Sequence, residues 1–197
     1  KNARRKADDK LLTKKMLKKM KVSHPKLLGT LSSVEKIRGF NWNKLREGFV
    51  MKPVQGFGGQ GILLIKKPAK EEGYFWTVEG KKIGTEELSL HAQDIVEGKF
   101  SHNNLPDRVM IEERIKIHSK FKKLAVGGAP DVRVIVFNKV PVMAMLRLPT
   151  EKSGGKANLD KGAVGLGIDM ATGITTHAVS GKKQLIKYFP DSTKKVN

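Results

Sequence analysis

The chain has 197 residues, enough for one sizeable hydrophobic core or two small lobes, and its 39% hydrophobic content is ordinary for a folded protein. Its 39 Lys and Arg against 19 Asp and Glu give a formal net charge of +20, which indicates an anionic partner: nucleic acid, nucleotide phosphate, an acidic peptide or a membrane surface. The lack of cysteine excludes disulfides and thiolate metal sites. Without a membrane-span-length apolar run or a signal-peptide pattern, we expect a soluble cytoplasmic protein.

The N-terminal segment predicts a basic amphipathic helix. Leu12, Met16 and Met20 recur every four residues among lysines, and the acidic pair at 8–9 suits the first turn of a helix. The pattern favours a surface helix that docks an apolar stripe on a core, with membrane-surface or nucleic-acid binding as alternatives. A short strand interrupted by Pro25 is expected to follow.

The stretch FVMKPVQGFGGQGILLIKK, residues 49–67, predicts strand, glycine-rich loop and strand. Its glycines satisfy G-x-G-x-x-G, but a dinucleotide-binding fold needs a helix next, and an apolar run stopped by Pro68 follows instead. No Gly-Lys-Ser/Thr closes a P-loop, and the lysine precedes the glycines, the reverse of the order in protein kinases. The segment suits a phosphate grip, in which backbone N–H groups approach a polyphosphate and Lys52 supplies a charge. A plain hairpin with a flexible turn is the alternative.

The stretch RVMIEERIKIH, residues 108–118, predicts a strand that runs into Glu112 and Glu113. These carboxylates are either ion-paired at a solvated strand end or hold a ribose hydroxyl while the backbone binds an adenine edge.

The stretch from 130 to 150 predicts a β-hairpin that turns at Asn138-Lys139. Arg133 and Arg147 lie one in each strand, and a two-residue turn makes them face opposite sides of the sheet unless a bulge near Pro141 changes the register. Such an arginine is either salt-bridged, for instance to Asp131, or meets an anion.

A long glycine-rich segment follows the hairpin, from Thr150 to Gly173. It carries Lys156, Asn158, Asp160 and Lys161, and is either a functional loop or a disordered linker. The five histidines lack ligand spacing, which argues against a zinc site, and no nucleophile-elbow motif is present.

Together, DDKLLTKK, FVMKPVQGFGGQGILLI, VMIEERI and the block from Gly128 to Val179 resemble the ATP-grasp fold, specifically the alpha-L-glutamate ligase-related proteins, kin of the ribosomal-protein glutamate ligases. The resemblance spans about Asp8 to Val179. It implies an α+β fold of two lobes with a nucleotide between them. Residues 1–111 would form the basic helix and first lobe, and 112–197 an incomplete second lobe.

The resemblance also implies functional residues. Lys52 would grip the ATP phosphates, the glycine-rich loop would close over them, and the strand at 112–115 would meet adenine and ribose. The implied cofactor-binding residues are Lys52, Gln55, Gly56, Gly58, Gly59, Gly61, Glu112, Glu113 and Ile115. The implied catalytic residues, which would line the phosphate and acceptor end of the cleft, are Arg133, Arg147, Lys156 and Asn158.

The implied activity is that of an ATP-dependent carboxylate–amine ligase, with glutamate as the amino acid ligated through an acyl phosphate. ATP and magnesium would be the cofactors, and a carboxylate acceptor, such as an acidic peptide, and an amino-acid amine would be the partners. Positive groups suit this chemistry because both ATP and a carboxylate are anionic.

The sequence departs from the family at its C-terminal end. Family members carry, beyond the IDMATG segment, an acidic strand pair with a Glu-x-Asn and a Pro-Gly turn that hold magnesium, whereas this chain ends in YFPDSTKKVN. Asp169 precedes that region, so metal ligands stay unassigned. The chain is thus expected to be a fragment, to have a separately encoded or unseen remainder, or to be a degenerate ATP-grasp that binds without catalysis, its basic surface serving nucleic acid or an acidic partner. A different branch, associated with sugar or peptidoglycan precursors, is a further alternative.

Overall fold

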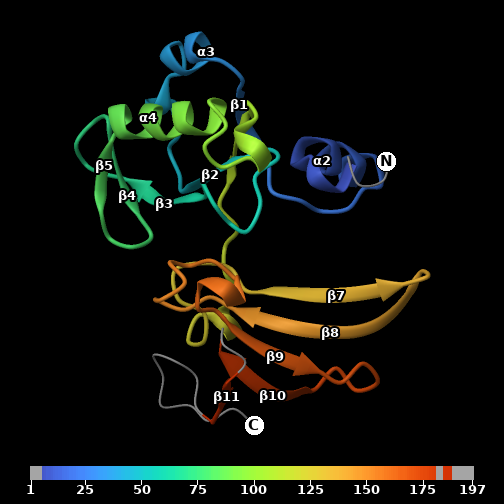
Figure 1. Cartoon of the computed structure of the whole chain (residues 1–197). Helices are drawn as coiled ribbons and strands as arrows, with labels where there is room; N and C mark the ends of the chain where they lie inside the picture. Colours follow the sequence, from blue (N-terminus) through green and yellow to red (C-terminus); the bar gives the residue numbers. More distant parts are fainter. Residues whose placement is uncertain (1–5, 181–183, 188–197) are drawn as a thin grey trace. The chain divides into compact units, whose positions relative to one another are not determined.

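The structure is a computed structural model that describes residues 6–180 and 184–187 (Figure 1). The chain divides into two compact units, Lys1–Ile115 and Lys116–Asn197. Antiparallel sheets with a few helices confirm the predicted α+β class. The boundary predicted between residues 111 and 112 falls inside the last strand of the first unit.

The first unit is built on a six-stranded antiparallel sheet of order β1-β6-β2-β3-β4-β5. Strands β2 and β6 are neighbours although more than fifty residues separate them, so the sheet brings the lysine of one beside the glutamates of the other. In chain order the elements are α2 (Lys10–Lys19), β1 (Leu27–Leu31), α3 (Val34–Arg38), the 3₁₀ turn η1 (Trp42–Lys44), β2 (Phe49–Pro53), β3 (Leu63–Pro68), β4 (Tyr74–Thr77), β5 (Lys82–Gly84), α4 (Thr85–Val96), η2 (His102–Asn104) and β6 (Val109–Glu113).

Alternation along β2 decides which side chains reach the core of the first unit. Phe49 and Met51 are completely buried and face α3 and α4, which lie on one side of the sheet (Figure 1). The helices contribute a matching apolar face: Ile37, Leu88, Ala92 and Ile95. Because successive residues of a strand point to opposite faces, Lys52 projects from the other side of the sheet.

The second unit holds a five-stranded antiparallel sheet of order β11-β10-β9-β8-β7. Its small core contains Leu148, Val164, Leu166 and Ala178. The elements are η3 (Ser119–Phe121), β7 (Asp131–Phe137), β8 (Val140–Leu148), η4 (Leu159–Lys161), β9 (Val164–Ile168), β10 (Thr175–Ser180) and β11 (Gln184–Ile186).

The hairpin predicted at Asn138-Lys139 is confirmed, with both turn residues at positive φ (46° and 68°). The strand register shifts between Ile135 and Val136, so the hairpin contains the bulge that the sequence analysis left as an alternative. Strand β9 pairs with β8 from Ala144 to Leu148, so among the described residues the outer half of the hairpin has no third strand beside β8. In the described ranges, no helix has the length and apolarity to cross a membrane.

Candidate functional site

Lys52 and Glu112 meet on the face of the first sheet opposite α3 and α4. Lys52 lies opposite Met110 and Glu112 opposite Val50, so the two charged residues are diagonal neighbours on one face. The Lys52 ammonium contacts Oε1 of Glu112 in an ion pair. The Glu112 side chain is only 7% exposed, and this geometry favours the ion-paired interpretation of that residue.

Helix α2 docks on this site through polar groups. Lys14 Nζ lies 3.0 Å from Oε2 of Glu112 and also donates to the carbonyl oxygen of Pro25. No residue of the helix is buried, and Met16 and Met20 are 44% and 67% exposed. Of the predicted apolar stripe, Leu12 is half-buried whereas Met16 and Met20 are exposed, so the stripe is covered only in part and ion pairs add to the attachment of the helix.

Asp9 fixes the start of helix α2. Its Oδ1 accepts hydrogen bonds from the backbone N–H groups of Leu11 and Leu12 (both 2.9 Å), as an N-cap residue does. Its Oδ2 lies 2.7 Å from Nη2 of Arg108, just before β6. One buried carboxylate therefore caps the helix and ties it to the sheet.

Lys10 is a second cation at the site. Its Nζ donates to the carbonyl oxygens of Val54 (3.1 Å) and Gly56 (2.8 Å), where the glycine-rich loop begins. Burial lowers the pKa of Lys10, and the nearby positive charge of Lys52 lowers it further. Sequence reasoning missed this residue, whose only signal was the Asp-Asp-Lys run at the helix start.

The glycine-rich loop from Gln55 to Gly61 is held at both ends. The backbone N–H of Gln55 donates to Oδ2 of the buried Asp107 (2.8 Å), and Nε2 of His91 lies 3.0 Å from the carbonyl oxygen of Gly61. Between these anchors the Phe57 ring stacks on His102, with centroids 4.1 Å apart. Gly58, Gly59 and Gly61 all have positive φ. The loop therefore has a defined shape, which favours a binding loop over a plain flexible turn.

The end of β6 supplies the remaining predicted residues of the first unit. Glu113 is exposed, and its backbone N–H donates to the carbonyl oxygen of Lys26 (2.9 Å). Ile115 is 54% exposed. Their roles toward adenine and ribose stay predictions.

The two arginines of the hairpin differ in their surroundings. The bulge puts Arg133 opposite Met145 and Asp131 opposite Arg147, so both arginines face the same side of the sheet. Arg147 forms a bidentate ion pair with Asp131, with both N···O distances 2.7 Å. Arg133 is exposed and makes no ion pair within the described residues.

The glycine-rich segment after β8 is built as a compact turn. Ser153 and Thr150 are buried and exchange hydrogen bonds with each other. A side chain at Gly128 would place Cβ 1.7 Å from the carbonyl oxygen of Gly155, so two backbones meet where only glycine fits. The segment carries Lys156 and Asn158, and Asn158 Oδ1 caps η4 by accepting from the backbone N–H of Asp160 (3.0 Å). This geometry favours an ordered loop over a linker.

The described residues contain no ready-made cluster of metal ligands. Over 6–180 and 184–187, no group of three or more His, Asp or Glu side chains could hold a metal ion by itself. Asp169 is used locally, because its Oδ1 accepts from the Thr172 hydroxyl (2.7 Å) and from the N–H groups of Ala171 and Thr172. The Thr172 hydrogen bonds hold the pKa of Asp169 below its ordinary value.

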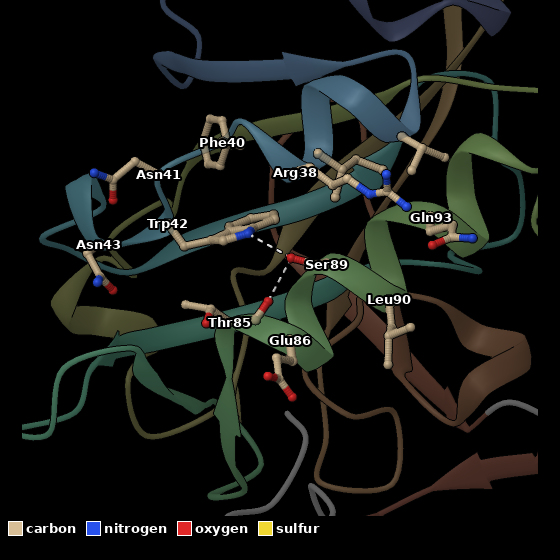
Figure 2. Close-up of a pocket in the computed structure, with 12 residues that line it drawn as sticks. Arg38, Phe40, Asn41, Trp42, Asn43, Thr85, Glu86, Ser89, Leu90 and Gln93 are labelled. Atoms are coloured by element: carbon tan, nitrogen blue, oxygen red, sulfur yellow. Dashed lines mark hydrogen bonds between the residues drawn. The ribbon is translucent and has the colours of Figure 1, made fainter.

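A separate hollow of about 620 Å³ lies between α3, η1 and α4 (Figure 2). At its floor the buried Trp42 donates its indole N–H to Ser89 Oγ (3.0 Å), which donates to the Thr85 carbonyl oxygen (2.8 Å). Arg38 and Glu86 line the hollow, but it contains no predicted site residue.

The whole of residues 2–197 matches the protein family described as sugar-transfer associated ATP-grasp. The chain therefore belongs to this ATP-grasp family, and the predicted ATP-grasp resemblance is confirmed. The family description corresponds to the sugar-associated branch that the sequence left as a further alternative, and kinship with glutamate ligases is not shown. Comparisons with curated proteins and with solved structures gave no match. ATP-grasp proteins bind ATP, generally with magnesium, and usually catalyse ATP-dependent carboxylate–amine ligation or related reactions.

Proposed function

We propose that the first unit binds the phosphates of ATP at Lys10, Lys52 and the glycine-rich loop. The observation that carries this proposal is the pair of ammonium groups at the root of the loop. The positive charge of Lys52 disfavours the protonated form of Lys10, whose pKa burial already lowers. An anion beside both lysines would relieve their repulsion, and a phosphate chain is such an anion.

We further propose that the chain takes part in ATP-dependent carboxylate–amine ligation. A carboxylate oxygen would attack the γ-phosphorus of ATP and break its bond to the β,γ-bridging oxygen, which gives an acyl phosphate and ADP. An amine nitrogen would then attack the acyl carbon, phosphate would leave, and loss of a proton would give the amide. We propose glutamate as the amino acid.

In the second unit, Arg133, Lys156 and Asn158, two residues after Lys156, are the proposed contacts to an anionic substrate. The exposed guanidinium of Arg133 supports this role, since no carboxylate of the described residues neutralises it. The Arg147 guanidinium is held by Asp131, and its proposed contribution is to fix the hairpin that carries Arg133.

Trapping of the acyl phosphate tests this function. The chain would be incubated with magnesium-ATP, hydroxylamine and a panel of carboxylates that includes glutamate and an acidic peptide. We expect a hydroxamate and stoichiometric ADP with the correct acceptor, and loss of both in Lys52→Ala. The exposed Lys66 on β3 offers a matched control, because Lys66→Ala removes the same charge away from the loop. ATP binding without hydroxamate or ADP for any acceptor would contradict the ligase proposal.

A degenerate ATP-grasp that binds a basic-surface partner is the second candidate. Lys15, Lys18 and Lys19 of helix α2 are exposed, which favours an acidic partner or nucleic acid at this helix. Binding of this kind should weaken steeply as salt rises. A titration of the chain into single-stranded oligonucleotide at two salt concentrations distinguishes this function from the ligase.

A further inference from the structure

Glu112 neutralises two lysines that come from different elements. Its Oε2 lies 3.0 Å from Lys14 Nζ of helix α2, and its Oε1 contacts Lys52 Nζ of strand β2. All three side chains are largely removed from solvent, at 7% exposure for Glu112, 12% for Lys14 and 21% for Lys52. The single negative charge of Glu112 is therefore shared by two positive charges in a partly buried site.

The two lysines are not equivalent. Lys14 has a second acceptor, the carbonyl oxygen of Pro25, and is the less exposed of the pair. Lys52 is the more exposed, and it lies near Lys10, which adds a further positive charge. An incoming anion would therefore replace Glu112 as the partner of Lys52 more readily than as the partner of Lys14, and Lys14 would keep the Glu112 carboxylate neutralised. Leaving that carboxylate buried without a cation would be costly.

We infer that Lys14 is a positioning residue that shares the Glu112 carboxylate and so leaves Lys52 available to a phosphate group. This inference rests on the proposed ATP-binding function and adds Lys14 as the residue that keeps Lys52 available to the phosphates. Without Lys14, the whole charge of Glu112 falls on Lys52, and a phosphate must compete with an undivided ion pair.

A double-mutant cycle tests the inference on the whole chain. Titration of magnesium-ATP into Lys14→Met should give a Kd about fivefold above that of the unmutated chain, the size of a moderate ion-pair effect. Glu112→Gln removes the competing charge, so Lys14→Met should change the Kd less than about twofold in that background. Lys14→Arg should restore binding, and Lys66→Met, which removes an exposed lysine of β3, is the matched control.

A purely structural role for Lys14 predicts a different result. If the lysine only holds helix α2 in place through its ion pair with Glu112, Glu112→Gln alone should weaken ATP binding about as much as Lys14→Met does, because both remove that ion pair. The inference predicts instead that Glu112→Gln binds ATP at least as tightly as the unmutated chain, because the charge that competes for Lys52 is gone. Weaker binding in Glu112→Gln overturns the inference.

A measurement without nucleotide separates the inference from the proposed function. Limited acetylation with residue-resolved mass spectrometry reports how available the Lys52 amine is. We expect acetylation of Lys52 to be about fivefold slower in Lys14→Met and faster in Glu112→Gln, since an ammonium in an undivided ion pair reacts more slowly. An unchanged acetylation rate of Lys52 in both variants would overturn the inference that Lys14 and Lys52 share the Glu112 carboxylate. Absence of ATP binding in the unmutated chain, with acetylation changed as expected, would refute the proposed function and leave the shared carboxylate supported.

Discussion

Two glycines of the loop at 55–61 should respond very differently to the same substitution. Gly58 and Gly61 both have positive φ, at 59° and 66°, so alanine at either costs about 1–2 kcal/mol of conformational energy. A Cβ at Gly58 meets no atom within 4 Å, whereas a Cβ at Gly61 would lie 2.6 Å from Cδ2 of Phe100. Phe100 packs against the core of the first unit, so displacing its ring adds about 1–3 kcal/mol.

Urea denaturation followed by tryptophan fluorescence measures this difference. Both tryptophans, Trp42 and Trp76, lie in the first unit, so the signal reports its unfolding. We expect Gly61→Ala to lower the free energy of unfolding by about 2–5 kcal/mol and Gly58→Ala by about 1–2 kcal/mol. In a Phe100→Ala background most of the excess cost at Gly61 should disappear, because the two closest atoms belong to the Phe100 ring.

Equal costs at the two glycines, or an excess at Gly61 that survives the loss of the Phe100 ring, would refute this explanation. The same variants also test the loop's function. Gly58→Ala, which leaves the core packing intact, should still weaken ATP binding if the backbone at Gly58 approaches the phosphates.

Three further predictions concern individual charged residues. Arg147→Lys should lower the free energy of unfolding by about 0.5–1.5 kcal/mol in urea titrations, because lysine cannot make the bidentate pair with Asp131; an unchanged midpoint would contradict this. Thr172→Val should raise the pKa of Asp169 in an NMR titration, because it removes the Thr172 hydroxyl that donates to this carboxylate. The stability that comes from the lowered pKa is present above about pH 4 and is lost as the pH falls through the folded-state pKa. An unchanged pKa in the variant would contradict this role of the Thr172 hydroxyl. The lowered pKa of Lys10 means that the folded protein binds fewer protons than the unfolded protein just below about pH 10.4, so the free energy of unfolding should rise with pH in that range. Lys10→Met should remove this rise, and an identical pH profile of stability in the variant would disprove the effect.

Local patterns predicted much of the fold. The segment 49–67 gave strand, loop and strand because apolar runs flank a glycine cluster, and β2 and β3 form there. The turn at Asn138-Lys139 was equally local, since a two-residue turn sets the pairing of the residues beside it. The bulge at Ile135 and Val136 was not readable in advance, because it depends on how the whole hairpin packs and twists.

The candidate site depends on contacts that no local pattern contains. Lys14 and Glu112 are almost a hundred residues apart, and nothing near Lys14 distinguishes it from the other lysines of the same helix. Asp107 was missed for the same reason: its partner, the backbone N–H of Gln55, is set by the neighbouring strands β2 and β6. Sequence periodicity also predicted an apolar docking face for helix α2, but it could not predict the ion pairs of Asp9 and Lys14 that attach the helix to the sheet.

The most direct test of the central claim is calorimetric titration of magnesium-ATP into the chain and into Lys52→Ala, with Lys66→Ala as the matched control. We expect saturable binding to the unmutated chain and to the control, and a Kd at least about tenfold higher in Lys52→Ala, because a charge-assisted phosphate contact is lost. Equal affinity of all three folded proteins would contradict the assignment of Lys52 to the ATP phosphates.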